Sequence, residues 1–386
     1  MRILYHHRTQ GEEPESIHIA EIVDAMREAG HEVLVVGPRG VRKNTAGATS
    51  PSLLARIKRK APQWIFELLQ IAYNSVAFVR LYRSVVMFKP VLIYERYALY
   101  SFVGVLVSRQ CGIPLILEVN TPYAHAWAQY YGLQFRRLAL WMEQRILLGA
   151  NHIITVTAAQ REMLQADGIP RERISVCHNA INPDLFEPNR YARDSVRAAL
   201  GLSGVVIGFV GTMNRWQGML EFPQVIHSVL NKHAEACFLM VGDGEYRAHI
   251  GDFCNREGFA RRVIFTGRKG HSEIPQLVAA MDIAILLNSN AYGSPMKIFE
   301  YLSMGKAVIA PSVPPVLEIL SDLETGLLIE AGDADAMATG ISLLIEKPEL
   351  RHKLGAAGRE YVTVDHTWAQ NVAKILEAYE KIARTN

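Results

Sequence analysis

One stretch of the chain indicates the fold: Gly293-Ser-Pro-Met-Lys-Ile-Phe-Glu-Tyr-Leu-Ser-Met-Gly-Lys-Ala-Val-Ile-Ala-Pro311. It follows an apolar run over residues 281–287 that predicts a buried strand. The Gly-Ser-Pro turn predicts the start of a helix, Gly305 predicts its end, and residues 307–310 predict the next strand. A loop that joins a strand to a helix N-terminus directs backbone N–H groups and a positive dipole end to one place. This arrangement suits an anionic ligand that carries hydroxyl groups.

Strand and helix patterns alternate along the whole chain, which predicts parallel sheets covered by helices. The predicted strands lie at residues 2–5, 31–36, 91–94, 114–118, 152–156 and 174–176 in the first half, and at 205–210, 237–241, 263–265, 283–287 and 308–310 in the second. A turn-rich break at residues 179–188 separates the halves, and a helical pattern covers 368–383. We therefore predict an N-terminal domain over residues 1–185, a linker over 186–203, a second domain over 204–366 and a terminal helix over 367–386.

Length and composition are those of an ordinary globular protein with two domains. The chain has 386 residues, of which 49% are hydrophobic and 20% charged. The net charge of +3 is too small to predict nucleic-acid binding. Four cysteines lie far apart without a CxxC pair, so we expect buried free thiols in a reducing compartment. No apolar run has the length of a membrane span or of a secretion signal, and we expect a cytoplasmic protein.

A second stretch, Gly208-Phe-Val-Gly-Thr-Met-Asn-Arg-Trp-Gln-Gly218, also joins a strand to a loop and a helix. Together with residues 293–311 it resembles the retaining GT-B glycosyltransferases of family 4. The resemblance covers almost the whole chain and is strongest from Gly208 to Gly332. It implies an α/β fold of two Rossmann-like domains that face a cleft, with parallel sheets and a C-terminal helix that crosses back to the first domain.

The same resemblance implies a reaction. The enzyme would transfer a sugar from a nucleotide diphosphate sugar, a UDP-sugar in preference to a GDP-sugar, to a hydroxyl group of a glycan, glycolipid or small-molecule acceptor. It would retain the anomeric configuration and use neither a metal ion nor another cofactor. Two alternatives stay open from the sequence. One is a GT-B sugar-nucleotide epimerase or phosphorylase, and the other is a non-catalytic subunit that binds a nucleotide sugar.

Several donor-binding residues follow from the family's signature helix. Glu300 matches the glutamate that accepts hydrogen bonds from the ribose hydroxyls, a task that suits a carboxylate because it can accept from two neighbouring hydroxyls. The position of the family's first glutamate is occupied by Tyr292, which we include in the predicted site. The helix opening at Pro295 and Met296 is predicted to hold the donor sugar, although Pro295 has no N–H to donate.

The leaving diphosphate requires positive charge at the site. The family normally has an arginine and a lysine at the positions where this chain has Thr212 and Gln217. We therefore assign the role to Arg215 in the same loop and to Lys297 at the helix opening. The backbone of Gly211 and Thr212 is predicted to lie beside the donor.

Further predictions concern neighbouring loops. Arg268 follows the strand where relatives receive the nucleobase, and Gly11 belongs to a loop that relatives place over the diphosphate. Asn120 occupies the position of a histidine that contacts the donor sugar in many relatives, and we count it as a catalytic candidate. Asp333 and Asp335 resemble a metal-binding DxD pair, but their place at a helix start predicts capping, so no metal site is expected.

Residues 53–66 combine four basic side chains with leucine, isoleucine, tryptophan and phenylalanine. Such a segment is typical of helices that lie on an anionic membrane surface. A solvated helix face that continues into a core helix explains the pattern equally well, and Pro62 interrupts any single long helix. The sequence thus leaves open whether the chain contacts the inner face of a membrane peripherally.

Overall fold

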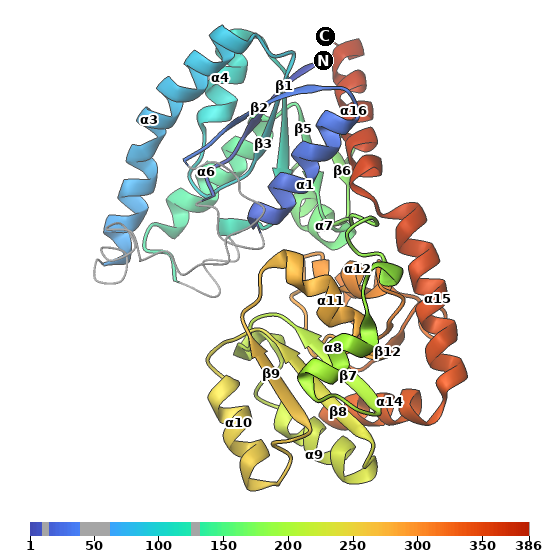
Figure 1. The fold of residues 1–386 in the computed structure, drawn as a ribbon. Helices are drawn as coiled ribbons and strands as arrows, with labels where there is room; N and C mark the ends of the chain where they lie inside the picture. The colour runs from blue at the N-terminus through green and yellow to red at the C-terminus, as the bar shows by residue number, and fades with distance from the viewer. Residues whose placement is uncertain (10–14, 39–61, 125–131, 386) are drawn as a thin grey trace. The chain divides into compact units, whose positions relative to one another are not determined.

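The computed structural model describes residues 1–9, 15–38, 62–124 and 132–385 (Figure 1). The chain forms two compact units, Met1–His178 with Trp368–Asn386, and Asn179–Thr367. Each unit contains one six-stranded sheet in which neighbouring strands are parallel. This confirms the predicted α/β class with two Rossmann-like domains. Cys177, Cys237 and Cys254 are buried thiols, as expected, whereas Cys111 is only half-buried.

The first sheet has the strand order β2-β1-β3-β4-β5-β6. Its strands are β1 (Arg2–His6), β2 (Glu32–Val36), β3 (Leu92–Arg96), β4 (Leu115–Val119), β5 (His152–Thr155) and β6 (Ile174–Val176). The helices are α1 (Glu15–Glu28), α3 (Gln63–Phe88), α4 (Val103–Cys111), α6 (Arg136–Gly149), α7 (Ala158–Ala166) and α16 (Trp368–Thr385), with the 3-10 turn η1 (Arg171–Arg173). The connection from β1 to β2 runs toward one edge of the sheet, and the connections from β2 through β6 run toward the opposite edge. Right-handed crossovers therefore place α1 on one face of the sheet and α3, α4, α6 and α7 on the opposite face.

The terminal helix α16 belongs to the first unit, as predicted. It packs along α1 and against β5, so the blue and red helices lie side by side in Figure 1. Trp368 at its start contacts the ring of His18 edge to face, with a centroid distance of 4.8 Å. Val372 and Ile375 are buried on the same helix. Early and late segments of the chain therefore complete one core.

The second sheet has the strand order β12-β11-β10-β7-β8-β9. Its strands are β7 (Val205–Val210), β8 (Ala236–Val241), β9 (Val263–Gly267), β10 (Ile283–Ile285), β11 (Ala307–Pro311) and β12 (Leu327–Ile329). The α-helices are α8 (Arg193–Leu200), α9 (Phe222–Lys232), α10 (Arg247–Arg256), α11 (Ile274–Ala279), α12 (Met296–Ser303), α13 (Pro314–Leu317), α14 (Ala334–Glu346) and α15 (Pro348–Asp365), and the 3-10 turns are η2 (Pro188–Arg190), η3 (Arg215–Gln217) and η4 (His271–Glu273). Alternate strand residues enter two cores, one shared with α9, α10 and α14 and the other with α11 and α12.

The segment 186–203, interpreted from the sequence as a linker, lies within the second unit. It forms η2 and α8, and Arg197 of α8 donates to the carboxylate of Asp282 at 2.5 Å. Ile181 pairs with Thr367, which sets the start of the unit before this segment. The interpretation differed because the partners of α8 lie far along the chain, and a local pattern does not reveal them.

The carboxyl ends of β7, β8 and β9 meet in close backbone contacts. The N–H of Gly211 donates to the carbonyl of Val241, and the N–H of Gly242 donates to the carbonyl of Gly267. Gly211 and Gly242 have φ angles of 146° and 136°. A Cβ atom at Gly242 would lie 1.9 Å from the carbonyl oxygen of Gly211. The loops that follow these strands are fixed relative to one another because only glycine fits there.

We predict that Gly242→Ala lowers the free energy of unfolding by roughly 2–4 kcal/mol, because the added methyl group combines backbone strain with a steric clash. The matched control is Gly251→Ala in α10, where a Cβ atom meets nothing within 4 Å. It should raise stability by about 0.5–1 kcal/mol, since alanine is the better helix former. Scanning calorimetry of both variants measures the difference. Equal melting temperatures would contradict the assigned contact.

Candidate functional site

A half-buried lysine places its ammonium group where β7 ends and α12 begins. Lys297 Nζ donates to Gln217 Oε1 at 2.8 Å and lies 4.5 Å from the centre of the Phe209 ring. A Cβ atom at Gly211 would lie 2.7 Å from the same nitrogen, so the ammonium rests directly against this backbone. Burial lowers the pKa of Lys297 to about 7, although the nearby Glu300 carboxylate acts in the opposite direction. The site thus holds a cation that gains strongly from an added negative charge.

The carboxylate of Glu300 lies one helical turn after Lys297, on the same side of α12. It is 9% exposed, and its Oε1 lies 3.3 Å from Nε2 of His271 in η4. The His271 ring packs against Phe186 with a centroid distance of 5.6 Å. Glu300 is therefore oriented from outside its own helix, and a carboxylate so held can accept from ligand hydroxyl groups.

The turn before α12 is fixed by side-chain amides. Asn290 Oδ1 accepts from the backbone N–H groups of Tyr292 and Gly293. Asn179 donates from Nδ2 to the carbonyl of Ser294 at 2.6 Å and from its backbone N–H to Ser294 Oγ at 3.2 Å. Pro295 is the N-cap of α12. The first N–H groups of a helix have no acceptor within it, so those of Met296 and Lys297 are oriented toward this edge of the sheet.

The other predicted site residues of the loops after β7 and β9 are exposed. Arg215 opens η3 with its backbone N–H bound to Glu245, and its side chain is exposed. Arg268 after β9 and Thr212 after β7 are also exposed. The structure therefore brings the predicted Lys297 against Gly211, with Glu300 one turn further along α12, and leaves Arg215 and Arg268 exposed on the same unit.

The first unit has its own polar cluster at the carboxyl ends of β3 and β4. Glu118 accepts from Tyr94 at 2.7 Å, from Arg96 at 2.8 Å and from the side-chain amide of Asn120. His18 Nδ1 lies 3.5 Å from the same carboxylate, and burial lowers the pKa of His18 to about 4. Burial alone would raise the pKa of Glu118, but these partners hold it below its usual value. Asn120 is thus oriented by a buried carboxylate.

Some functional residues were not assigned roles from the sequence. Gln217 was interpreted as a missing cation, yet its side-chain oxygen holds the Lys297 ammonium. The contact between His271 and Glu300 joins η4 to α12, and no local sequence pattern predicts it. The i, i+3 spacing of Lys297 and Glu300 was the one signal that indicated their common side. Gly11 lies outside the described residues.

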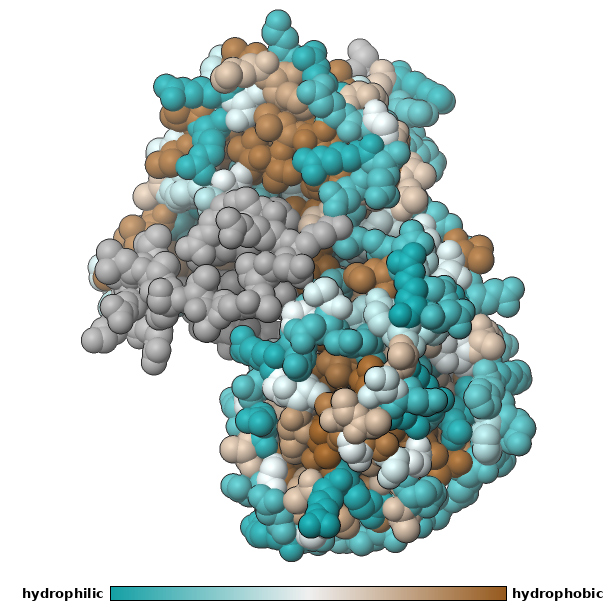
Figure 2. Space-filling model, in the orientation of Figure 1, coloured by the Kyte–Doolittle hydropathy of each residue, from teal (hydrophilic) through white to brown (hydrophobic). Residues whose placement is uncertain are grey.

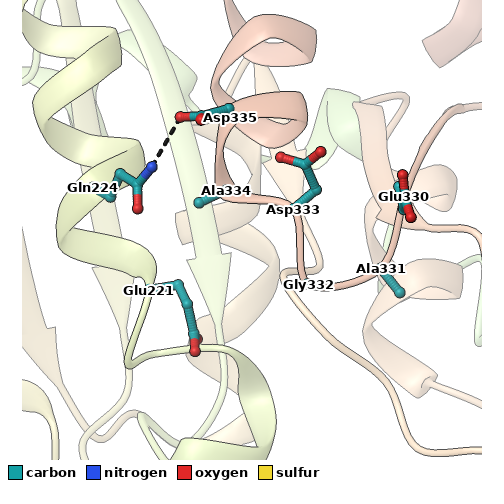
Figure 3. A pocket seen from close by; sticks show the side chains of 8 residues that line it. All are labelled: Glu221, Gln224, Glu330, Ala331, Gly332, Asp333, Ala334 and Asp335. Atoms are coloured by element: carbon teal, nitrogen blue, oxygen red, sulfur yellow. Dashed lines mark hydrogen bonds between the residues drawn. The ribbon is translucent and has the colours of Figure 1, made fainter.

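An acidic pocket lies between α9 and α14 (Figure 3). It is lined by the carboxylates of Glu221, Glu330, Asp333 and Asp335. Asp333 accepts from the N–H of Ala336 and caps α14, as predicted, and Asp335 accepts from Gln224 at 2.9 Å. Like charges repel an anionic ligand, so this pocket is unsuited to a diphosphate. In the described part of the chain, no group of three or more His, Cys, Asp or Glu residues is placed to hold a metal ion.

Two family models match the chain. Glycosyltransferase Family 4 matches residues 16–185, and Glycosyl transferases group 1 matches residues 204–347. A GDP-mannose-dependent alpha-mannosyltransferase of Mycobacterium tuberculosis is 24% identical over 94% of this chain and 92% of its own. An alpha-D-kanosaminyltransferase of Streptomyces kanamyceticus is 23% identical over 66% of this chain and 67% of its own.

Solved structures share the fold of the whole chain. HepE of Anabaena, determined in complex with UDP, has a TM-score of 0.74 at 17% identity and covers 98% of this chain and 100% of its own. Sucrose-phosphate synthase of Thermosynechococcus elongatus has a TM-score of 0.76 at 17% identity, with 100% of both chains covered. At this level of identity the likeness concerns the fold.

The lowered pKa of Lys297 predicts a pH dependence of anion binding. A diphosphate beside Lys297 favours the charged amine, so above the pKa of about 7 the protein must take up a proton when the ligand binds. We expect the affinity for UDP to fall by up to about tenfold per pH unit above that value, and to change little below it. Isothermal titration calorimetry in buffers of different ionisation enthalpy measures both the affinity and the proton uptake.

Lys297→Arg is the control for this titration, because a guanidinium stays charged throughout the range. The variant should lose the extra proton uptake and the slope above neutral pH. If wild type and variant gave the same profile, Lys297 would not be the titrating group.

Proposed function

The chain belongs to glycosyltransferase family 4 and has the GT-B fold of nucleotide-sugar-dependent glycosyltransferases, and we propose that it transfers a sugar from a UDP-sugar to an acceptor hydroxyl with retention and without a metal ion. The observation that carries this proposal is the placing of Lys297 and Glu300 one turn apart at the start of α12. One side chain supplies positive charge and the other accepts hydrogen bonds. A nucleotide diphosphate needs both from its site.

Lys297 supports departure of the diphosphate. Negative charge grows on the leaving phosphate as the bond to the sugar carbon C1 breaks, and a fixed cation in a dry site stabilises that charge. The N-terminus of α12 adds its own positive end. We therefore assign to this pair the electrostatic work that a metal ion performs in other transferases. The exposed Arg215 is a second candidate for the same work, through its place in the loop after β7.

The carboxylate of the first unit bears on the route of the reaction, since retention through a covalent sugar–enzyme intermediate requires a free nucleophile. Glu118 is buried and already engaged by Tyr94, Arg96 and Asn120, so it is a poor nucleophile toward a sugar. We propose that the acceptor oxygen forms its bond to C1 on the face from which the diphosphate leaves. The acceptor proton passes to the departing phosphate oxygen. Asn120 is the candidate for a hydrogen bond to the sugar in this step.

The choice of uridine rests on comparison. HepE of Anabaena was crystallised with UDP and, in another structure, with UDP-glucose, whereas the mycobacterial relative is named for GDP-mannose. Both bases occur among proteins of this kind. Our proposal of UDP follows the precedent of HepE. An epimerase, a phosphorylase or a non-catalytic subunit is not favoured, because the matching relatives are named glycosyltransferases.

The test of the proposed reaction is the stereochemistry of the product. The protein is incubated in EDTA with a panel of UDP- and GDP-sugars and simple hydroxyl acceptors, and the anomeric proton of the product is followed by NMR. An α-linked product from an α-linked UDP-sugar supports the proposal. A β-linked product, a strict need for magnesium or manganese, or turnover of GDP-sugars alone would each overturn the corresponding part.

Glu300→Ala should weaken UDP binding by roughly 1.5–3 kcal/mol, the scale of hydrogen bonds to a charged group. The control is Glu324→Ala, which removes an exposed glutamate of the same unit. Calorimetric titration at one pH compares the two variants with wild type. A dissociation constant that stays unchanged in Glu300→Ala would remove this residue from the donor site.

A further inference from the structure

Large apolar side chains are exposed mainly on one part of the first unit. Among the described residues, 18 large hydrophobic side chains are exposed, and 11 of them lie on α3, α4 and α6. These helices cover the same face of the first sheet, and α3 packs against α4. Gly149 at the end of α6 meets Val105 of α4 so closely that a Cβ atom would lie 2.5 Å from it. We call the outer surface of these three helices the α3–α4–α6 face.

The longest part of this face is α3, a helix of 26 residues. Its exposed apolar side chains run from Trp64 in the first turn through Val76 and Val79 to Val86 and Met87 in the last. Figure 2 shows hydrophobic residues along the outer side of this helix, at the upper left of the molecule. A solvated helix normally presents polar residues on its outer side, so a stripe of this length indicates a surface that meets an apolar phase or partner.

The helices α4 and α6 continue the stripe. Leu106 of α4 and Leu138, Trp141 and Leu148 of α6 are exposed. Arg145 lies over the Trp141 ring, with its guanidinium carbon 5.8 Å from the ring centre. A tryptophan beside an arginine is suited to the boundary between water and hydrocarbon, since the ring is apolar and both side chains carry N–H donors.

The charge of this face has one sign. Every residue of the three helices is described, and six exposed positions hold arginine: Arg80, Arg83, Arg109, Arg136, Arg137 and Arg145. The only two carboxylates, Glu67 and Glu143, are buried. By contrast, α16 on the opposite face of the sheet alternates charge, with Lys381 paired to Glu377 at 2.7 Å.

The two acidic residues point inward because tyrosines hold them. Tyr100 donates to Glu67 at 2.6 Å, and Tyr97 donates to Glu143 at 2.8 Å. Glu67 also accepts from the backbone N–H of Gln134. The packing of the unit therefore keeps both carboxylates away from the outer surface, and the α3–α4–α6 face carries only positive charge.

We propose that the α3–α4–α6 face docks the protein on an anionic lipid bilayer. Exposed aliphatic and tryptophan side chains would enter the outer hydrocarbon, and the arginines would contact lipid phosphates. A second copy of the chain is a poor occupant, since a self-complementary contact would bring arginines together with no carboxylate to pair them. Nucleic acid would satisfy the arginines but not the aliphatic stripe.

This face shares only residues 63–66 with the segment 53–66 singled out in the sequence. Residues 53–61 lie outside the described part of the chain, and the proposal rests on the helices from Gln63 onward. Among the described residues, no helix is both long and apolar enough to cross a membrane. The proposed contact is therefore with the surface of the bilayer, and it is independent of the identity of the donor sugar.

The test is flotation of the full chain with vesicles of phosphatidylcholine alone or mixed with phosphatidylglycerol. Wild type should float with the anionic vesicles and much less with the neutral ones. Adding salt should release it, because surface charge is screened. The double variant Val79→Glu/Val86→Glu should abolish flotation, and Arg83→Gln should weaken partitioning about fivefold, the effect of one cation near a charged membrane.

Matched controls keep the result specific. Leu317→Glu/Val364→Glu adds the same charge at exposed positions of the second unit, with 51% and 60% exposure against 49% and 53% for Val79 and Val86. It should float like wild type, and the melting temperature of both double variants should match wild type. Absence of flotation in wild type, or equal loss in both double variants, would overturn the proposal. So would a dimer, measured by light scattering, that only Val79→Glu/Val86→Glu separates.

Discussion

The contact between the backbones of Gly211 and Gly242 is the constraint on which the second unit's site depends. With no Cβ atom on either residue, the loops after β7 and β8 touch directly, and 2.7 Å would separate a Cβ at Gly211 from the Lys297 ammonium. The cation therefore lies against peptide groups and the Phe209 ring, which replace part of its hydration. A solvated lysine would contribute little, because water would already satisfy it. The close packing of the two loops therefore strengthens the attraction between the Lys297 ammonium and an anionic ligand.

The alternation of patterns was sufficient to predict two parallel sheets, because the central strands β3, β4, β8, β10 and β11 are buried on both faces and the helical patterns between them begin at turn signals. The helix opening at residues 293–296 could be placed from its glycine and proline alone. Its partners could not. Gln217 and His271 acquire their roles from contacts that join separate loops. In the sequence Gln217 was a departure from the family pattern, and His271 was assigned no role. The extent of α8 was missed for the same reason, because its stability comes from Asp282, far along the sequence.

Charge is handled differently in the two units. The first unit buries carboxylates under hydroxyl groups, in the pairs Tyr94 with Glu118, Tyr97 with Glu143, and Tyr100 with Glu67. All three tyrosines follow one another along β3 and the loop after it, and each reaches a different element. A buried carboxylate is costly without such partners, so the pairs tie β4, α6 and α3 to β3 and the loop after it. The second unit instead holds a half-buried cation, Lys297, whose side-chain hydrogen bond goes to the neutral amide oxygen of Gln217.

The packing of α16 on α1 has a consequence for the order in which the protein matures. A ribosome delivers the first 178 residues long before the segment that begins at Trp368, yet both belong to one compact unit. Until then the side of α1 that packs against α16, with the ring of His18, is exposed. The second unit can close on itself in the meantime, since domains fold as they emerge. The nascent first unit therefore stays incompletely folded until α16 is synthesised. During this interval it exposes the apolar surface that a chaperone binds.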